Sequence, residues 1–190
     1  MASAPALAYV PHPTETVSHI ATDITRLLRA ANETLGVAES LTGGGVMAAL
    51  TSDPGASAVF RGGVVSYATE LKRELLGVDA ALIAREGVIH GEVAAQMAHG
   101  ARQVTSFADE DTMTNWGVGT TGVAGPDLQD GKPAGTVFIG VVGGDNTRVY
   151  GPFQFPGSRE QVREAAVLEA LARLRGALVE KAEANKGWSV

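Results

Sequence analysis

Apolar residues recur at helical spacing near both ends of the chain. In the first segment they are Val17, Ile20, Ile24, Leu27 and Leu28. This pattern predicts a helix that is capped by Thr14 and ends near Ala31. In the last segment they are Val167, Leu171, Leu174 and Leu178. This second pattern predicts a final helix that begins at Ser158.

Between these helices, apolar runs rich in β-branched residues alternate with glycine-rich turns and shorter helical patterns. Strands are predicted at residues 35–39, 59–67, 116–119, 136–142 and 148–155. Helices are predicted at residues 43–50, 69–76 and 93–104. Gly62-Gly63 inside the second strand indicates a bulge or a close approach of the backbone. Helices and strands alternate early and strands gather before the last helix, which predicts an α/β fold with a mixed sheet and helices on both faces.

The chain is expected to form a single domain. Residues 1–13 contain three prolines and are predicted to be a flexible lead-in. The domain itself is expected to span residues 14–180, with residues 181–190 as a frayed tail. At 190 residues, 45% of them hydrophobic, the chain is long enough to bury a substantial core.

Charge and composition exclude several classes of function. The formal net charge is −6, and the 15 Lys and Arg residues are not concentrated in any segment, which argues against a nucleic-acid or anionic-membrane partner. No apolar run approaches the roughly 20 residues of a membrane helix. The N-terminal residues lack the basic start and apolar core of a signal peptide, so we expect a cytoplasmic protein.

The sequence offers no obvious metal or cofactor site. It has no cysteine, which excludes disulfides, cysteine-rich zinc sites and a thiolate nucleophile. Its four histidines do not have the spacing of metal ligands. We expect neither a metal nor a cofactor, and any covalent catalysis must use Ser, Thr, Lys or a carboxylate.

A serine at the end of the first predicted strand leads into a glycine cluster. Ser40 is followed by Thr42, Gly43 and Gly44, whose N–H groups can stabilise an anion at the start of a helix. This layout suits a nucleophilic serine with an oxyanion site. A serine that merely caps a helix has the same local pattern, so the glycines do not decide between the two interpretations.

Two later residues can handle the proton of Ser40. An uncharged Lys72 amine can accept it, provided that burial lowers the lysine pKa by about three units from its ordinary value of about 10.4. Tyr67 can relay a proton or orient the lysine. The alternatives are a solvated helix lysine and a core aromatic residue.

A second glycine-rich segment and two arginines are candidates for substrate binding. Thr120, Thr121, Gly122 and Gly125 offer hydroxyls and open N–H groups for a phosphate, ribose or carboxamide oxygen. The spacing fits neither a Walker A loop nor a dinucleotide fingerprint. The arginines, four residues apart at the start of the last helix, suit a phosphate or pair with nearby glutamates. They are Arg159 and Arg163.

Four segments in this order resemble the CinA C-terminal domain family, which includes nicotinamide-nucleotide amidohydrolases (NMN deamidases). They are residues 38–44 (AESLTGG), Tyr67 with Lys72, residues 121–126 (TGVAGP) and residues 132–137 (KPAGTV). The resemblance implies a three-layer αβα sandwich that hydrolyses the carboxamide of nicotinamide mononucleotide (NMN) to the acid and ammonia. It also implies Ser40 as nucleophile and Lys72 as its base, with Tyr67 close by. Two positions depart from the family pattern, Leu41 where cysteine is common and Thr69 where asparagine is frequent.

The resemblance leaves one rival function open. A non-catalytic nucleotide-binding or protein-interaction module can have the same fold and keep the same pocket. NMN is the expected small-molecule partner in the enzymatic interpretation. An apolar helix face left over after packing would indicate a homodimer.

Overall fold

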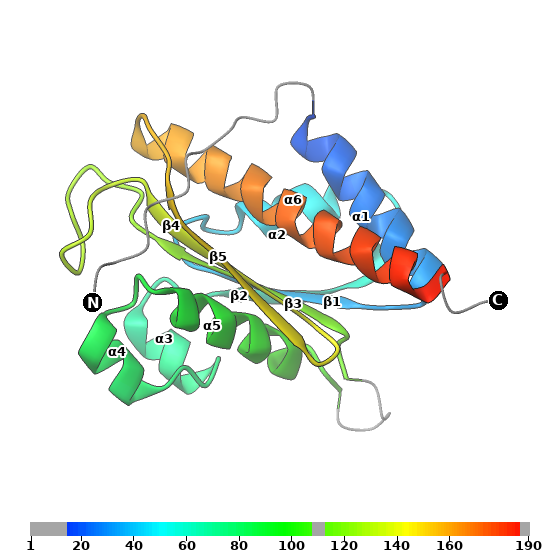
Figure 1. Ribbon diagram of the computed structural model, residues 1–190, viewed down its shortest axis with the longest axis horizontal. Helices are drawn as coiled ribbons and strands as arrows, with labels where there is room; N and C mark the ends of the chain where they lie inside the picture. Colours follow the sequence, from blue (N-terminus) through cyan, green and yellow to red (C-terminus); the bar gives the residue numbers. More distant parts are fainter. Residues whose placement is uncertain (1–14, 108–112, 187–190) are drawn as a thin grey trace.

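A five-stranded sheet with the strand order β2-β1-β3-β4-β5 forms the middle layer of the computed structural model (Figure 1). The structure describes residues 15–107 and 113–186. The strands are β1 (Leu35–Glu39), β2 (Phe60–Val65), β3 (Trp116–Gly122), β4 (Thr136–Gly143) and β5 (Asn146–Gln154). Strand β1 pairs in parallel with β2 and β3, whereas β4 pairs antiparallel with β3 and β5. The predicted mixed sheet is confirmed.

Helices cover both faces of this sheet (Figure 1). On one face lie α1 (Val17–Ala31), α2 (Gly45–Thr51) and α6 (Arg159–Lys186), and a short 3-10 helix, η1 (Ala56–Ala58), follows α2. On the other face lie α3 (Thr69–Glu74), α4 (Ala80–Glu86) and α5 (Gly91–Val104). The predicted three-layer αβα sandwich is therefore confirmed.

Several element boundaries differ from the sequence-based prediction. Thr16 caps α1, because its side chain accepts a hydrogen bond from the His19 N–H, whereas Thr14 lies outside the described residues. Helix α6 continues through residues 181–186, where the sequence predicts a frayed tail. Lys181 pairs there with Glu33 and lies over the Trp116 ring, and these contacts hold the last turns against the sheet.

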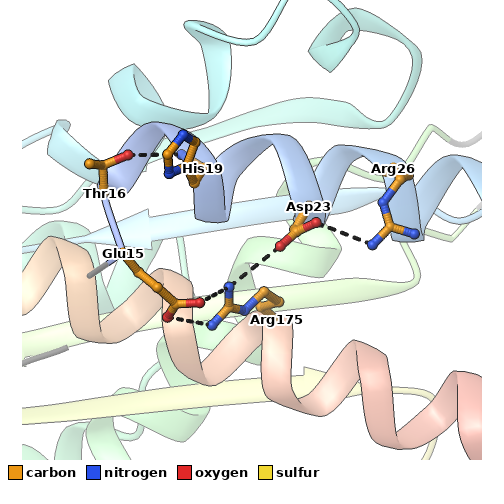
Figure 2. A network of polar contacts seen from close by, with 6 residues as sticks. All are labelled: Glu15, Thr16, His19, Asp23, Arg26 and Arg175. Carbon is orange, nitrogen blue, oxygen red and sulfur yellow. Dashed lines mark hydrogen bonds and ion pairs between the residues drawn. The ribbon is translucent and has the colours of Figure 1, made fainter. Parts of the chain in front are cut away.

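The start of α1 is joined to the middle of α6 by an ionic network (Figure 2). The Arg175 guanidinium donates to both carboxylate oxygens of Glu15 at 2.7 Å and to Asp23 at 3.4 Å. Glu15 raises the pKa of Arg175 above its ordinary value. A bidentate pair has a fixed geometry, so this network sets how the two helices of this layer meet.

The bulge predicted in the second strand is present. Leu35 lies opposite Phe60, but the next residue of β1, Gly36, lies opposite Gly62. Arg61 is therefore the extra residue of β2. Gly62 takes a φ of 129°, a conformation that other residues rarely adopt, which explains the glycine at this position.

Helix α5 packs unusually close to the sheet because glycines of β3 face it. A Cβ atom added to Gly117 would lie 2.0 Å from the Ala98 carbonyl oxygen, and one added to Gly119 would lie 2.3 Å from that of Ala94. Both alanines are fully buried. The main chains of helix and sheet thus meet with almost no side chain between them, which fixes α5 and the segment before it.

Gly119→Ala is expected to lower the free energy of unfolding by about 2–3 kcal/mol, because overpacking forces the helix away from the strand. Urea denaturation measures this change. The matched control is Gly176→Ala in α6, where nothing lies within 4 Å of the added Cβ. There a gain of about 0.5–1 kcal/mol is expected from helix propensity. An unchanged stability in Gly119→Ala would contradict the close packing.

Candidate active site

The predicted catalytic residues lie together at the edge of the sheet where its parallel strands end. Ser40 directly follows β1, Lys72 lies on the helix after β2, and residues 123–126 follow β3. Because the carboxyl ends of parallel strands meet at one edge, these segments converge there. They surround a cavity of about 320 Å³. Its lining includes Ser40, Tyr67, Lys72, Gly122, Gly125 and Arg159.

Lys72 reaches Ser40 from the buried side of this cavity. Its Nζ lies 3.0 Å from the Ser40 Oγ and 2.5 Å from the Ser66 carbonyl oxygen. Only 1% of the lysine is exposed, and no ion pair joins it to a carboxylate among the residues that the structure describes. Burial lowers the pKa of Lys72 to about 8, although the nearby Glu70 acts in the opposite direction. A useful fraction of this amine is thus uncharged near neutral pH.

Most N–H groups in the turn that carries Ser40 already have an acceptor. The Ser40 N–H donates to the Thr120 carbonyl oxygen, Gly43 to that of Ser40, and Gly44 to a side chain of β1. The structure therefore does not support Gly43 and Gly44 as oxyanion donors. Within the described ranges, the N–H groups of Leu41 and Thr42 have no acceptor. Of these two residues, Leu41 lines the cavity.

The acceptor on β1 is Glu39, a residue that the sequence analysis missed. Its carboxylate is fully buried and accepts hydrogen bonds from the N–H groups of Gly44 at 2.9 Å, Val46 at 3.2 Å and Met47 at 2.8 Å. An acidic residue at the end of an apolar strand, directly before the candidate nucleophile, was the signal that could have found it.

The two threonines of the second glycine-rich segment are used inside the protein. The Thr120 hydroxyl lies 2.8 Å from that of Thr42, and the Thr121 hydroxyl donates to the Val88 carbonyl oxygen at 2.7 Å. Both threonines are fully buried and neither lines the cavity. Their hydroxyls therefore join the turn of Ser40 and the segment before α5 to β3, while Gly122 and the residues after it form the cavity wall.

The two candidate arginines have different positions. Arg159 lies at the cavity, where it donates to the Gly125 carbonyl oxygen at 2.7 Å and to the Tyr67 hydroxyl at 2.5 Å. Arg163 lies behind the turn of Ser40 and donates to the carbonyl oxygens of Leu41 and Thr42, each at 3.1 Å. Arg159 is thus available to a ligand in the cavity, whereas Arg163 supports the turn.

Tyr67 is positioned by Arg159 rather than by Lys72. Its side chain lines the cavity and is 59% exposed, and its hydroxyl accepts the hydrogen bond from Arg159. No hydrogen bond to Ser40 or Lys72 is found for it in the described structure.

Neither a metal site nor a membrane-spanning helix is found in the part of the chain that the structure describes. No group of three or more His, Cys, Asp or Glu side chains in residues 15–107 and 113–186 is arranged to hold a metal ion. No helix within those ranges is both long and apolar enough to cross a membrane.

The family model described as "CinA C-terminal domain" matches residues 17–178. The chain belongs to this family. Among curated relatives of the CinA C-terminal domain, the CinA-like protein of Frankia casuarinae is 48% identical over 149 residues, covering 78% of this chain and 33% of that protein. The CinA-like protein of Parasynechococcus marenigrum is 41% identical over 162 residues, covering 84% and 37%. The chain thus spans about a third of the length of these relatives.

Solved structures of the CinA superfamily have the same fold. A superfamily protein from Klebsiella pneumoniae is 29% identical with a TM-score of 0.80, covering 87% of this chain and 99% of that one. A competence/damage inducible protein from Agrobacterium tumefaciens is 30% identical with a TM-score of 0.76, covering 90% and 99%. The family resemblance in the four sequence segments is confirmed.

Proposed function

We propose that this CinA C-terminal domain hydrolyses the carboxamide of NMN to nicotinate mononucleotide and ammonia. The observation that carries the proposal is the 3.0 Å contact between the Ser40 hydroxyl and the buried Lys72 amine, at the wall of a cavity. Serine and lysine in hydrogen-bond contact form an acyl-transfer pair once the lysine is uncharged. The lowered pKa of Lys72 supports this condition.

In the first step the Ser40 Oγ attacks the carboxamide carbon. An uncharged Lys72 has two N–H bonds and one lone pair. One N–H donates to the Ser66 carbonyl oxygen, and this directs the lone pair toward the Ser40 hydroxyl, whose proton it accepts. The N–H groups of Leu41 and Thr42 stabilise the negative oxygen of the tetrahedral intermediate. One such donor lowers the barrier by about 3–4 kcal/mol.

In the second step the C–N bond breaks. The Lys72 ammonium returns its proton to the departing nitrogen, so the leaving group is neutral ammonia. The nicotinoyl group remains as an ester on Ser40. A water molecule then attacks this ester with Lys72 as the base, and the acid and free Ser40 are released.

In this proposal the nucleotide part of NMN binds at the mouth of the cavity. A volume of about 320 Å³ lies within the range of small-molecule sites. The Arg159 guanidinium at the rim suits a phosphate, because its fork of donors matches phosphate oxygens. The exposed Tyr67 ring offers a flat face for the pyridinium, and its hydroxyl keeps Arg159 in place.

Ammonia release from NMN tests this proposal, with nicotinamide and NAD as comparison substrates. The enzyme is expected to prefer NMN, because nicotinamide lacks the phosphate and NAD carries an additional nucleotide. Binding of NMN without any release of ammonia would instead support a non-catalytic nucleotide-binding module. Faster release of ammonia from another amide would show that NMN is not the preferred substrate. The proposal that Ser40 and Lys72 form the catalytic pair would be unaffected.

The rate is expected to rise with pH through the pKa of Lys72. Because the uncharged amine is the active form and the pKa is about 8, about a tenth of the enzyme is competent at pH 7. The value of kcat/KM should therefore increase almost tenfold per pH unit from pH 6 to 7 and level off above pH 9. Ammonia release measured from pH 6 to 10 gives this profile. A profile that is flat or falling between pH 6 and 8 would exclude Lys72 as the base.

A further inference from the structure

Next to the nucleophile lies a buried carboxylate that the reaction steps do not use. Glu39 is 0% exposed, and no salt bridge is found between it and a cation in residues 15–107 and 113–186. Removing a carboxylate from water carries a large cost in free energy. Three hydrogen bonds from main-chain N–H groups offset this cost. An apolar side chain would fill the same space without this cost, so core packing alone does not explain a carboxylate at this position.

The contacts of Glu39 enclose the turn that carries Ser40. Its side chain extends from the end of β1 to the N–H groups of Gly44, Val46 and Met47, five to eight residues ahead. Gly44, the N-cap of α2, has no side chain with which to cap the helix. The Glu39 carboxylate takes over that task, so residues 40–43 are held as a closed loop between β1 and α2.

The main chain of Glu39 is connected to the base as well. Its carbonyl oxygen accepts hydrogen bonds from the Ser66 N–H at 2.8 Å and the Ser66 hydroxyl at 3.3 Å. The carbonyl oxygen of Ser66 in turn accepts the 2.5 Å bond from Lys72. Glu39 therefore precedes the nucleophile directly and reaches the base through one intervening residue.

We propose that Glu39 is a positioning residue for the serine–lysine pair. By taking up three N–H groups of α2, its carboxylate fixes the turn so that the Ser40 Oγ faces the Lys72 Nζ, and it leaves the N–H groups of Leu41 and Thr42 for the oxyanion. It also fills the start of α2 with a charge of the protein's own.

The proposal rests on the proposed function for its substrate, but the reactivity of Ser40 can be measured without NMN. A fluorophosphonate probe labels an activated serine, and mass spectrometry of the labelled peptide gives the rate. In Glu39→Gln the side chain keeps its size, but an NH₂ group replaces one acceptor and faces main-chain N–H groups. The labelling rate and kcat per folded molecule are expected to fall about 100-fold, as for a displacement of about 1 Å at a reacting group. KM should change little.

Two further variants separate positioning from general destabilisation. Glu169→Gln removes another buried carboxylate, 2% exposed, which pairs with Arg173 on α6 away from the cavity. It is expected to lose stability but to keep the wild-type labelling rate per folded molecule. Glu39→Asp keeps the charge on a shorter side chain, and its labelling rate should lie between those of Glu39→Gln and the wild type.

The proposal is overturned if folded Glu39→Gln or Glu39→Asp is labelled at the wild-type rate. It is also overturned if Glu169→Gln loses reactivity to the same extent, because the effect would then be one of stability. Failure of the wild type to release ammonia from NMN is a separate result. It would remove the substrate assignment, while the labelling rates would still decide the role of Glu39.

Discussion

Ser40→Ala is expected to abolish ammonia release from NMN, with kcat at least about 1,000-fold below the wild type. The variant lacks the only hydroxyl that lies 3.0 Å from the Lys72 amine in the described structure. Under the proposed mechanism, any residual rate would come from direct attack by water, with the Leu41 and Thr42 N–H groups stabilising the oxyanion. The substitution removes one oxygen atom and leaves the glycine turn intact, so NMN should still bind. Calorimetric titration and a coupled ammonia assay measure the two properties.

Ser52→Ala provides the matched control for this substitution. Ser52 lies at the end of α2, and its hydroxyl donates to the Ala49 carbonyl oxygen, outside the cavity. Its activity should equal that of the wild type. If Ser40→Ala kept a tenth or more of the wild-type kcat, Ser40 would not be the nucleophile, even with binding unchanged.

Lys72→Met is expected to lose activity to a similar extent and at the same time to make the protein more stable at pH 7. Methionine fills most of the volume of the lysine side chain without a charge. The wild-type lysine has a pKa of about 8 when folded and an ordinary value of 10.5. At 1.36 kcal/mol per pKa unit, keeping its charge buried below pH 8 costs about 3 kcal/mol.

The sign of the pH dependence follows from these two pKa values. Between pH 8 and 10.5 the unfolded chain binds more protons at Lys72 than the folded protein does, so the stability of the wild type rises with pH relative to that of the variant. The advantage of Lys72→Met should therefore shrink by about 3 kcal/mol between pH 7 and 10.5. Urea denaturation of both proteins at several pH values measures this difference.

Lys132→Met is the control, at a partly exposed lysine outside the cavity. Its change in stability over the same pH range is the reference against which the change in Lys72→Met is compared. A constant difference between Lys72→Met and the wild type would show that Lys72 is not held in the folded state with a lowered pKa. The explanation for the pH–rate profile would then be lost as well.

The pairing of Ser40 with Lys72 was predicted through the resemblance to the CinA C-terminal domain family, whereas local sequence alone also allowed a solvated helix lysine. The structure supplies the physical reason: each residue follows a strand, and the parallel neighbours β1 and β2 end at the same side of the sheet. The contact of Lys72 with the Ser66 carbonyl oxygen was not predicted. Every residue has a main-chain carbonyl group, so the sequence does not single out this one. Only the fold of the segment between β2 and α3 determines that it faces the lysine.

The hydrogen-bond partners of individual N–H and hydroxyl groups were predicted less well, because several acceptors compete for each donor in the folded chain. The N–H groups of Gly43 and Gly44 were expected at the oxyanion, but a neighbouring carbonyl and the Glu39 carboxylate take them. The hydroxyls of Thr120 and Thr121 are likewise taken by partners inside the protein, the Thr42 hydroxyl and the Val88 carbonyl oxygen. Local sequence shows which groups can donate a hydrogen bond. It does not show which acceptor is nearest in the folded chain.

Helix α4 was missed for a different reason. It has seven residues, and Leu82 is the only buried one among them, so no apolar repeat can form. Its start is encoded by Asp79, whose side chain accepts from the Ala81 N–H. A cap without a periodic pattern behind it is too weak a signal to predict a helix.

Because β1, β2 and β3 are parallel, their N-terminal ends lie together on the side of the domain opposite the cavity. The Gly144 turn lies there, between β4 and β5, and so does the last part of α6, where Lys181 pairs with Glu33. Strand β3 has seven residues, which separates the two edges by roughly 20 Å. An epitope tag or fluorescent reporter inserted at Gly144 would be kept away from the substrate by the full length of the strands.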